Sequence, residues 1–171
     1  FYQILSIFED PQEVWNNISA PELKFLGAKT VQTLRAARNE KYISSLFESL
    51  EAAECRAIPR ISDAYPPLLS QIYDPPVTLY VRGECPLDGE KMFAIVGSRR
   101  CTRDGQRAAR EIAAHLARED VTIVSGLARG VDTYAHQGAL SVHGKTIAVL
   151  GSGPDVIYPP ENDQLAEQIL I

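Results

Sequence analysis

Three continuous apolar runs, separated by amphipathic stretches, organise the second half of the chain. The runs cover residues 93–96, 121–124 and 146–150, which is the length of a strand. Between them, residues 106–118 and 131–140 place apolar side chains at helical spacing. Strands that alternate with helices predict an α/β fold with a parallel sheet, and continuous apolar strands predict cover on both sheet faces. We therefore expect a doubly wound parallel sheet with right-handed crossovers.

The first 56 residues predict short helices instead. Asp10 and Ser19 each stand three residues before a glutamate, with a proline between, and this pattern is typical of helix starts. Asn39 is a suitable cap between the last two predicted helices. Residues 26–30 resemble a helix-hairpin-helix turn without its second glycine, which favours a structural or partner role over DNA contact. We expect a small helical domain over residues 1–56.

A proline-rich connector begins at residue 57. Proline removes a backbone donor and fixes φ, so long helices are excluded up to residue 90. Residues 77–81 alternate and are rich in β-formers, which predicts a short strand on an edge of the main sheet. The connector must be tied to a core, so we expect burial of its apolar side chains, namely Tyr65, Leu68, Leu69, Ile72 and Tyr73. Connector and sheet together make up the second predicted domain, residues 57–171.

Composition and the two ends of the chain indicate which broad class of protein to expect. Hydrophobic residues make up 45% of the 171 residues, which is enough for a packed core. No apolar run approaches the roughly 18 residues of a membrane span, and no secretory signal stands at the start, so we expect a cytoplasmic protein without a membrane partner. Reduced thiols are expected at Cys55, Cys85 and Cys101, which form no C-x-x-C pair. The chain stops within a predicted helix over 161–170, so we expect a fragment of a longer protein.

Charge is unevenly distributed. The first 90 residues carry 8 Lys and Arg against 13 Asp and Glu, whereas residues 91–171 carry 9 of each. A basic cluster lies just after the first predicted strand and consists of Arg99, Arg100, Arg103, Arg107 and Arg110. The last three have helical spacing, which favours a solvated helix face. Arg99 precedes the helix and is the better candidate for a ligand, unless it braces the turn by pairing with Asp104.

Small residues end all three predicted strands. The ends are Gly97-Ser98, Ser125-Gly126 and Gly151-Ser152. The carboxyl ends of parallel strands meet at one edge of the sheet, where open α/β sheets bind ligands. Small residues let a ligand approach the backbone N–H groups, and N–H groups at a following helix start attract anions. The expected ligand therefore carries phosphate, and we expect the loop from Gly126 to Gly130 to need positive φ or close backbone approach.

Common nucleotide signatures are missing from these strand ends. A dinucleotide fingerprint needs G-x-G-x-x-G after the first strand, but only Gly97 matches, and the second strand ends at Ser125 instead of a carboxylate. Residues 138–146 imitate a Walker A loop, yet five residues separate Gly138 from Gly144, and the motif leads into a strand. We expect no cofactor.

The sequence also lacks clear combinations of residues that could catalyse a reaction. The three histidines lack metal-ligand spacing, and no strand-end serine has an assigned base or lies in G-x-S-x-G. Asp132 and His136 stand at i, i+4, where a hydrogen bond would lock the helix start and its glycine loop. This pair could also act as acid and base, but we favour the structural pair. The sequence therefore predicts a protein that is not an enzyme, with no catalytic and no metal-binding residue.

Several of these segments together resemble the DprA/Smf family of DNA-processing proteins. The resemblance rests on the order and spacing of residues 94–99, 124–132, 135–136 and 146–151, followed by Tyr158-Pro159 and Asn162. The connector from Tyr65 to Gly83 and the helical N-terminus resemble the same family's connector and sterile-alpha-motif-like domain. Tyr134 departs from the pattern, because the family usually has a small residue there.

The resemblance implies an extended Rossmann-like domain that binds single-stranded DNA, protects incoming strands and loads a RecA-type recombinase during natural transformation, with a homodimer in the full-length protein. The family's Gly-Ser-Arg motif falls on Gly97, Ser98 and Arg99 as phosphate contacts. The alternative, a related nucleotide hydrolase or phosphoribohydrolase, would show P-G-G-x-G-T, and no such run occurs. Our candidate DNA contacts are Gly97, Ser98, Arg99, Ser125, Gly126, Arg129, Gly130, Gly151 and Ser152.

Overall fold

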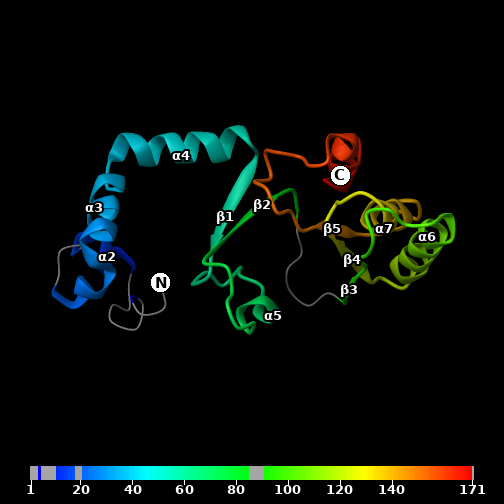
Figure 1. The fold of residues 1–171 in the computed structure, drawn as a ribbon, viewed down its shortest axis with the longest axis horizontal. Helices are drawn as coiled ribbons and strands as arrows, with labels where there is room; N and C mark the ends of the chain where they lie inside the picture. Colours follow the sequence, from blue (N-terminus) through cyan, green and yellow to red (C-terminus); the bar gives the residue numbers. More distant parts are fainter. Residues whose placement is uncertain (1–3, 5–10, 18–20, 85–90, 171) are drawn as a thin grey trace. The chain divides into compact units, whose positions relative to one another are not determined.

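Two compact units make up the chain (Figure 1). The computed structural model describes residue 4 and residues 11–17, 21–84 and 91–170. The first unit is Phe1–Ala52 and the second is Ala53–Ile171. Asp10, Ser19 and Cys85 lie outside the described residues, and the caps expected at Asp10 and Ser19 stay predictions.

The first unit is helical. Its elements are α2 (Pro11–Asn16), the 3-10 helix η1 (Pro21–Leu26), α3 (Gly27–Ala37) and α4 (Glu40–Ala52). The predicted cap at Asn39 is confirmed, because its Oδ1 accepts hydrogen bonds from the backbone N of Lys41 at 2.9 Å and of Tyr42 at 3.3 Å. The stretch that resembles a helix-hairpin-helix turn is instead the junction where η1 ends and α3 begins.

The connector forms a small sheet of its own. Strand β1 (Cys55–Pro59) pairs antiparallel with β2 (Thr78–Arg82), and the single-turn helix α5 (Pro67–Ser70) lies between them in sequence. The strand predicted at 77–81 is therefore present. Its predicted place on an edge of the main sheet is wrong, because β1 and β2 form a separate two-stranded sheet.

Burial within the connector is mixed. Tyr65 is buried as predicted, and its hydroxyl donates a hydrogen bond to the backbone oxygen of Pro76 at 2.8 Å. The prediction is wrong for Leu68, Ile72 and Tyr73, which are exposed. Leu68 lies on α5, which is one turn long and has no buried residue, and Ile72 and Tyr73 follow after this helix ends.

A three-stranded parallel sheet forms the rest of the second unit. Its strands β3 (Met92–Ala94), β4 (Thr122–Ser125) and β5 (Thr146–Ala148) lie in the order β3-β4-β5. The crossover helices are α6 (Arg103–Arg118) and α7 (Val131–Leu140), and the short η2 (Pro160–Asn162) and α8 (Asp163–Ile169) follow β5. Helices α6 and α7 contact each other, as Figure 1 shows. The predicted α/β fold with a Rossmann-like parallel sheet is confirmed.

The core between sheet and helices uses small residues. Ile123 of β4 is fully buried against alanines of both crossover helices, Ala113, Ala117, Ala135 and Ala139. A second cluster joins Leu127, after β4, to Leu165 and Ala166 of α8. The expected cover on both faces is wrong for β3, whose three residues are exposed. As the edge strand it has only β4 as a neighbour in the described sheet.

Candidate functional site

A pocket of about 290 Å³ opens where the three parallel strands end. Its lining comes from the segments that follow β3, β4 and β5, and consists of Arg99, Gly126, Ala128, Arg129, Leu150, Gly151, Ser152, Tyr158 and Pro159. The loops after consecutive strands meet here because the strands are parallel and adjacent. Five of the nine candidate DNA contacts thus line one pocket. They are Arg99, Gly126, Arg129, Gly151 and Ser152.

The loop after β3 packs directly on the start of α7. The backbone N of Val131 donates a hydrogen bond to the Ser98 oxygen at 3.2 Å, and the Ser98 hydroxyl accepts one from the Arg100 N–H at 3.1 Å. Gly130 has φ +80°, and a Cβ there would overlap that same Ser98 oxygen. A Cβ at Gly97 would lie 2.8 Å from a Val131 methyl group. The close backbone approach expected at Gly130 is confirmed, although Gly97 and Gly130 themselves do not line the pocket.

Arg99 is exposed and has no carboxylate within ion-pair distance among the described residues. The possible brace is Asp104, but this carboxylate pairs with Arg107 at 3.4 Å instead. The Arg99 guanidinium therefore brings an uncompensated positive charge to the pocket. A planar guanidinium suits the oxygens of a phosphate group.

The hydroxyls of Ser125 and Ser152 both donate hydrogen bonds to backbone oxygens within the protein. Ser125 is buried, and its Oγ donates a hydrogen bond to the Ile95 oxygen at 2.6 Å. This hydrogen bond ties β4 to the end of the neighbouring strand, and contact of Ser125 with DNA stays a prediction. The Ser152 hydroxyl lies in the pocket wall but donates to the Val156 oxygen at 2.7 Å.

Asp132 locks the glycine loop after β4. Its Oδ2 accepts a hydrogen bond from the Gly126 N–H at 3.1 Å, and a Cβ at Gly126 would lie 2.8 Å from that oxygen. Asp132 is buried on the first turn of α7. The predicted lock on the loop therefore exists, but it runs to the backbone of Gly126.

His136 bonds to a different group from the one predicted. Its Nδ1 lies 2.7 Å from the Thr146 hydroxyl, which itself donates to the Ile123 oxygen at 2.8 Å. Because the Thr146 hydroxyl already donates its hydrogen to the Ile123 oxygen, it accepts a hydrogen bond from Nδ1–H of His136. Nε2 of His136 then carries the lone pair. Burial lowers the pKa of His136 to about 4, against a smaller opposing effect of Asp132. A buried, neutral imidazole that links α7 to β5 has a structural role.

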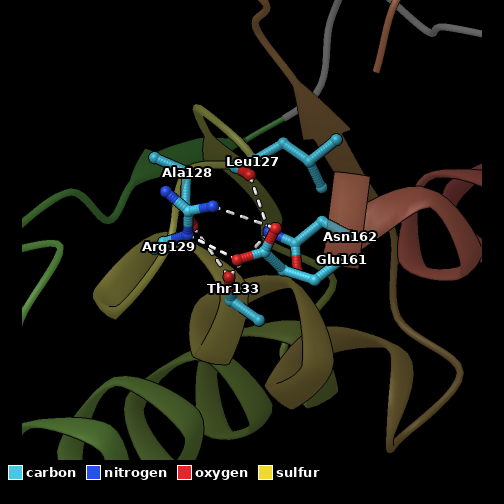
Figure 2. Close-up of polar contacts among 6 residues, drawn as sticks. All are labelled: Leu127, Ala128, Arg129, Thr133, Glu161 and Asn162. Atoms are coloured by element: carbon cyan, nitrogen blue, oxygen red, sulfur yellow. Dashed lines mark hydrogen bonds and ion pairs between the residues drawn. The ribbon is translucent and has the colours of Figure 1, made fainter. Parts of the chain in front are cut away.

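Arg129 lines the pocket and forms an ion pair with Glu161. Its Nε and Nη2 donate hydrogen bonds to the two carboxylate oxygens of Glu161, the latter at 3.1 Å (Figure 2). The guanidinium carbon also lies 5.8 Å from the centre of the Tyr158 ring. Hydrogen bonds with Glu161 raise the pKa of Arg129, and the same bonds lower the pKa of Glu161.

The residue beside Glu161 fixes this arrangement. Asn162 is buried, and its Nδ2 donates hydrogen bonds to the Leu127 oxygen at 2.8 Å and to the Thr133 hydroxyl at 2.9 Å (Figure 2). The Thr133 hydroxyl in turn donates to the Ala128 oxygen at 2.7 Å. The loop after β4 and the segment after β5 are therefore held together at the pocket. In the sequence, Asn162 stands out only as part of the motif that carries the family resemblance, and no motif singles out Glu161 as a site residue.

The described part of the chain contains neither a cluster of metal ligands nor a membrane-spanning helix. No group of three or more His, Cys, Asp or Glu side chains there could hold a metal ion. None of the described helices combines the length and the apolar character of a membrane span.

Two curated proteins are similar to this chain over much of its length. The DNA processing protein DprA of Streptococcus pneumoniae is 46% identical over 109 residues, which are 64% of this chain and 38% of that protein. Protein Smf of Synechocystis is 38% identical over 170 residues, which are 95% of this chain and 42% of that protein. The chain thus spans about two fifths of the length of these relatives.

Solved structures show the same fold. The X-ray structure of DprA from Streptococcus pneumoniae superposes with a TM-score of 0.75 at 33% identity and covers 98% of this chain and 58% of that one. A DprA structure from Helicobacter pylori, described for its single-stranded DNA binding mode, gives a TM-score of 0.60 at 32% identity over 68% of this chain and 52% of that one. The family model described as DNA recombination-mediator protein A matches residues 56–171. This match spans the connector, all three strand ends and the pocket, and the chain therefore belongs to the DprA/Smf family of DNA recombination-mediator proteins.

Proposed function

We propose that this chain is the single-stranded DNA-binding part of a DNA-processing protein, and that its pocket at the three strand ends holds the DNA backbone. The observation that carries the proposal is Arg99, an exposed arginine without an ion-pair partner among the described residues, in a pocket lined by glycines. Phosphate groups need both features, a positive charge and close access to backbone N–H groups. The Helicobacter pylori relative, whose structure is described for single-stranded DNA binding, supports the choice of ligand.

Single strands fit this pocket better than a duplex. Beside the arginines it offers the half-exposed ring of Tyr158 and the side chain of Leu150. An aromatic ring can stack on a base only when the base is free of its own partner strand. Phosphate contacts position the strand without reading its sequence, so we expect little base preference.

Nucleotide hydrolysis is the alternative that the test must address. His136 is buried and bonded to Thr146, and the Ser125 and Ser152 hydroxyls donate to backbone oxygens. None of these groups is paired as nucleophile and base at the pocket, which supports a protein that binds without catalysis. We further propose that the protein binds DNA without a cofactor.

The wider roles rest on the family. Protection of incoming DNA, loading of a RecA-type recombinase in natural transformation, a homodimer of the full-length protein and a cytoplasmic location are our proposals for the complete protein. The recombination-mediator description of the family supports a recombinase partner. A test with purified recombinase belongs to the full-length protein, because this chain spans about two fifths of its curated relatives.

The DNA proposal is tested by fluorescence anisotropy with a labelled oligo-dT and a duplex of equal length, each titrated at several salt concentrations. We expect tighter binding of the single strand and a negative slope of log affinity against log salt, about 0.7 per neutralised phosphate. The same preparation is incubated with ATP, NAD and nucleoside monophosphates. Absence of single-strand binding, or release of base or phosphate well above background, would overturn the proposal.

A further inference from the structure

The pocket holds two arginines in different states. Arg99 has no acidic partner among the described residues, whereas the Nε and Nη2 of Arg129 both bind the carboxylate of Glu161. The positive charge of Arg129 is therefore compensated within the protein. Of the two arginines predicted to contact DNA, only Arg99 offers its charge freely in this structure.

Glu161 occupies the position on Arg129 that a phosphate would take. Its two oxygens bind the side edge of the guanidinium in a two-pronged geometry (Figure 2). Phosphate oxygens bind arginine through the same paired donors. A carboxylate and a phosphate cannot both use these two N–H groups, so the two anions exclude each other.

Displacement of Glu161 requires no rearrangement of the backbone. The anchor of this segment is the neighbour, Asn162, which is buried and bonded to Leu127 and Thr133. Glu161 itself leaves about half of its side chain exposed, as does Arg129. Exposed ion pairs are weak because water and salt screen them, so a phosphate with additional contacts can replace the carboxylate.

We propose that Glu161 is an internal anion that competes with a DNA phosphate for Arg129 and thereby limits the affinity of the pocket for single-stranded DNA. This proposal rests on the proposed function and names a residue that tunes it. In the free protein the pocket carries the net charge of one arginine. Bound DNA gains a second phosphate contact only after the Glu161 side chain has turned away.

The isosteric variant Glu161→Gln tests the competition. It removes the negative charge and keeps the size of the side chain, so Arg129 becomes available to phosphate. We expect affinity for labelled oligo-dT to rise about fivefold at low salt, because the phosphate no longer has to displace a carboxylate from Arg129. The slope of log affinity against log salt should steepen by about 0.7, which is one phosphate. Adding Arg129→Gln to this variant should return affinity and slope to the wild-type values.

Glu167→Gln is the matched control. Glu167 has the same charge and similar exposure, but it pairs with Arg82 and does not line the pocket. This control separates a general change in net charge from a change at Arg129, and we expect less than about a twofold effect on affinity. Thermal melting of all variants reports on folding.

Any of four outcomes would overturn the inference. Glu161→Gln could weaken binding, which would make Glu161 a positioning residue for Arg129. It could leave the salt slope unchanged, or its effect could persist in the double variant or appear equally in the control. If the wild-type protein and every variant fail to bind single strands, the proposed function fails as well. If the wild-type protein binds single strands and the Glu161→Gln variant binds them with the same affinity and salt slope, only the proposed competition is disproved.

Discussion

Arg99 and Arg129 are chemically identical side chains that line the same pocket in different electrostatic states. Their local partners make the difference, since Glu161 neutralises one and no described carboxylate reaches the other. Arginine identity alone therefore says little about which side chain attracts DNA. The positions of neighbouring carboxylates decide it.

For Arg99→Ala we expect weaker binding of single strands and a salt slope shallower by about 0.7, because one phosphate contact is lost. Preference between oligonucleotides of different sequence should not change. The measurement is anisotropy titration at several salt concentrations. Arg107→Ala removes an equally charged side chain that is exposed and paired with Asp104, and serves as the control. A wild-type slope in the Arg99 variant, together with a lower melting temperature, would assign Arg99 to bracing of the turn.

Gly130 illustrates a residue whose role at the site is purely steric. Gly130→Ala would place a Cβ against the Ser98 oxygen on a backbone with φ +80°, so we expect a loss of at least about 2 kcal/mol in the free energy of unfolding. Gly151→Ala is the matched control in the same pocket, since nothing lies within 4 Å of a Cβ there. Urea denaturation measures both. Equal stability of the two variants would show that the loop adapts to the added methyl group.

Among the secondary-structure elements, α7 connects the site to the sheet. Asp132 on its first turn binds the loop after β4, and His136 one turn later binds Thr146 of β5. The histidine is neutral and buried, so this link responds to acid. The protonation state of His136 therefore links the stability of the fold to pH.

We expect stability to fall as the pH drops from about 6.5 to about 4. In that range the unfolded chain protonates His136 while the folded protein, with the pKa of His136 lowered to about 4, does not. The loss reaches at most about 3 kcal/mol, at 1.36 kcal/mol per pKa unit. Urea denaturation at each pH should show a smaller decline for His136→Asn than for the wild type. Parallel pH profiles of the two proteins would refute a lowered pKa at His136.

Elements differed in how well the sequence predicted them. The parallel strands and the pocket at their ends were predictable, because apolar runs alternate with helices and consecutive parallel strands end at one edge. The ion pair of Arg129 and Glu161 was not, since it joins surface-type residues 32 positions apart. Strand β1 was missed because Cys55–Pro59 contains Arg56 and a terminal proline instead of an alternating apolar pattern.

The whole molecule divides into two units, and only the second contains the candidate site. Every residue that lines the pocket lies between Arg99 and Pro159. The second unit, Ala53–Ile171, also has its own buried clusters around Ile123 and Leu127. The family model begins at residue 56, so its match lies within the second unit.

These observations predict that residues 53–171 fold and bind single strands without the helical unit. The physical reason is that each contact described at the pocket, including the pairs made by Arg129 and Asn162, lies within the second unit. Circular dichroism and urea denaturation of the fragment should show a cooperative transition. Oligo-dT titration should give an affinity within about twofold of the 171-residue chain and the same salt slope. A folded fragment with a shallower slope would mean that basic residues of the first unit also neutralise phosphates, and the DNA-binding surface would then extend onto the helices.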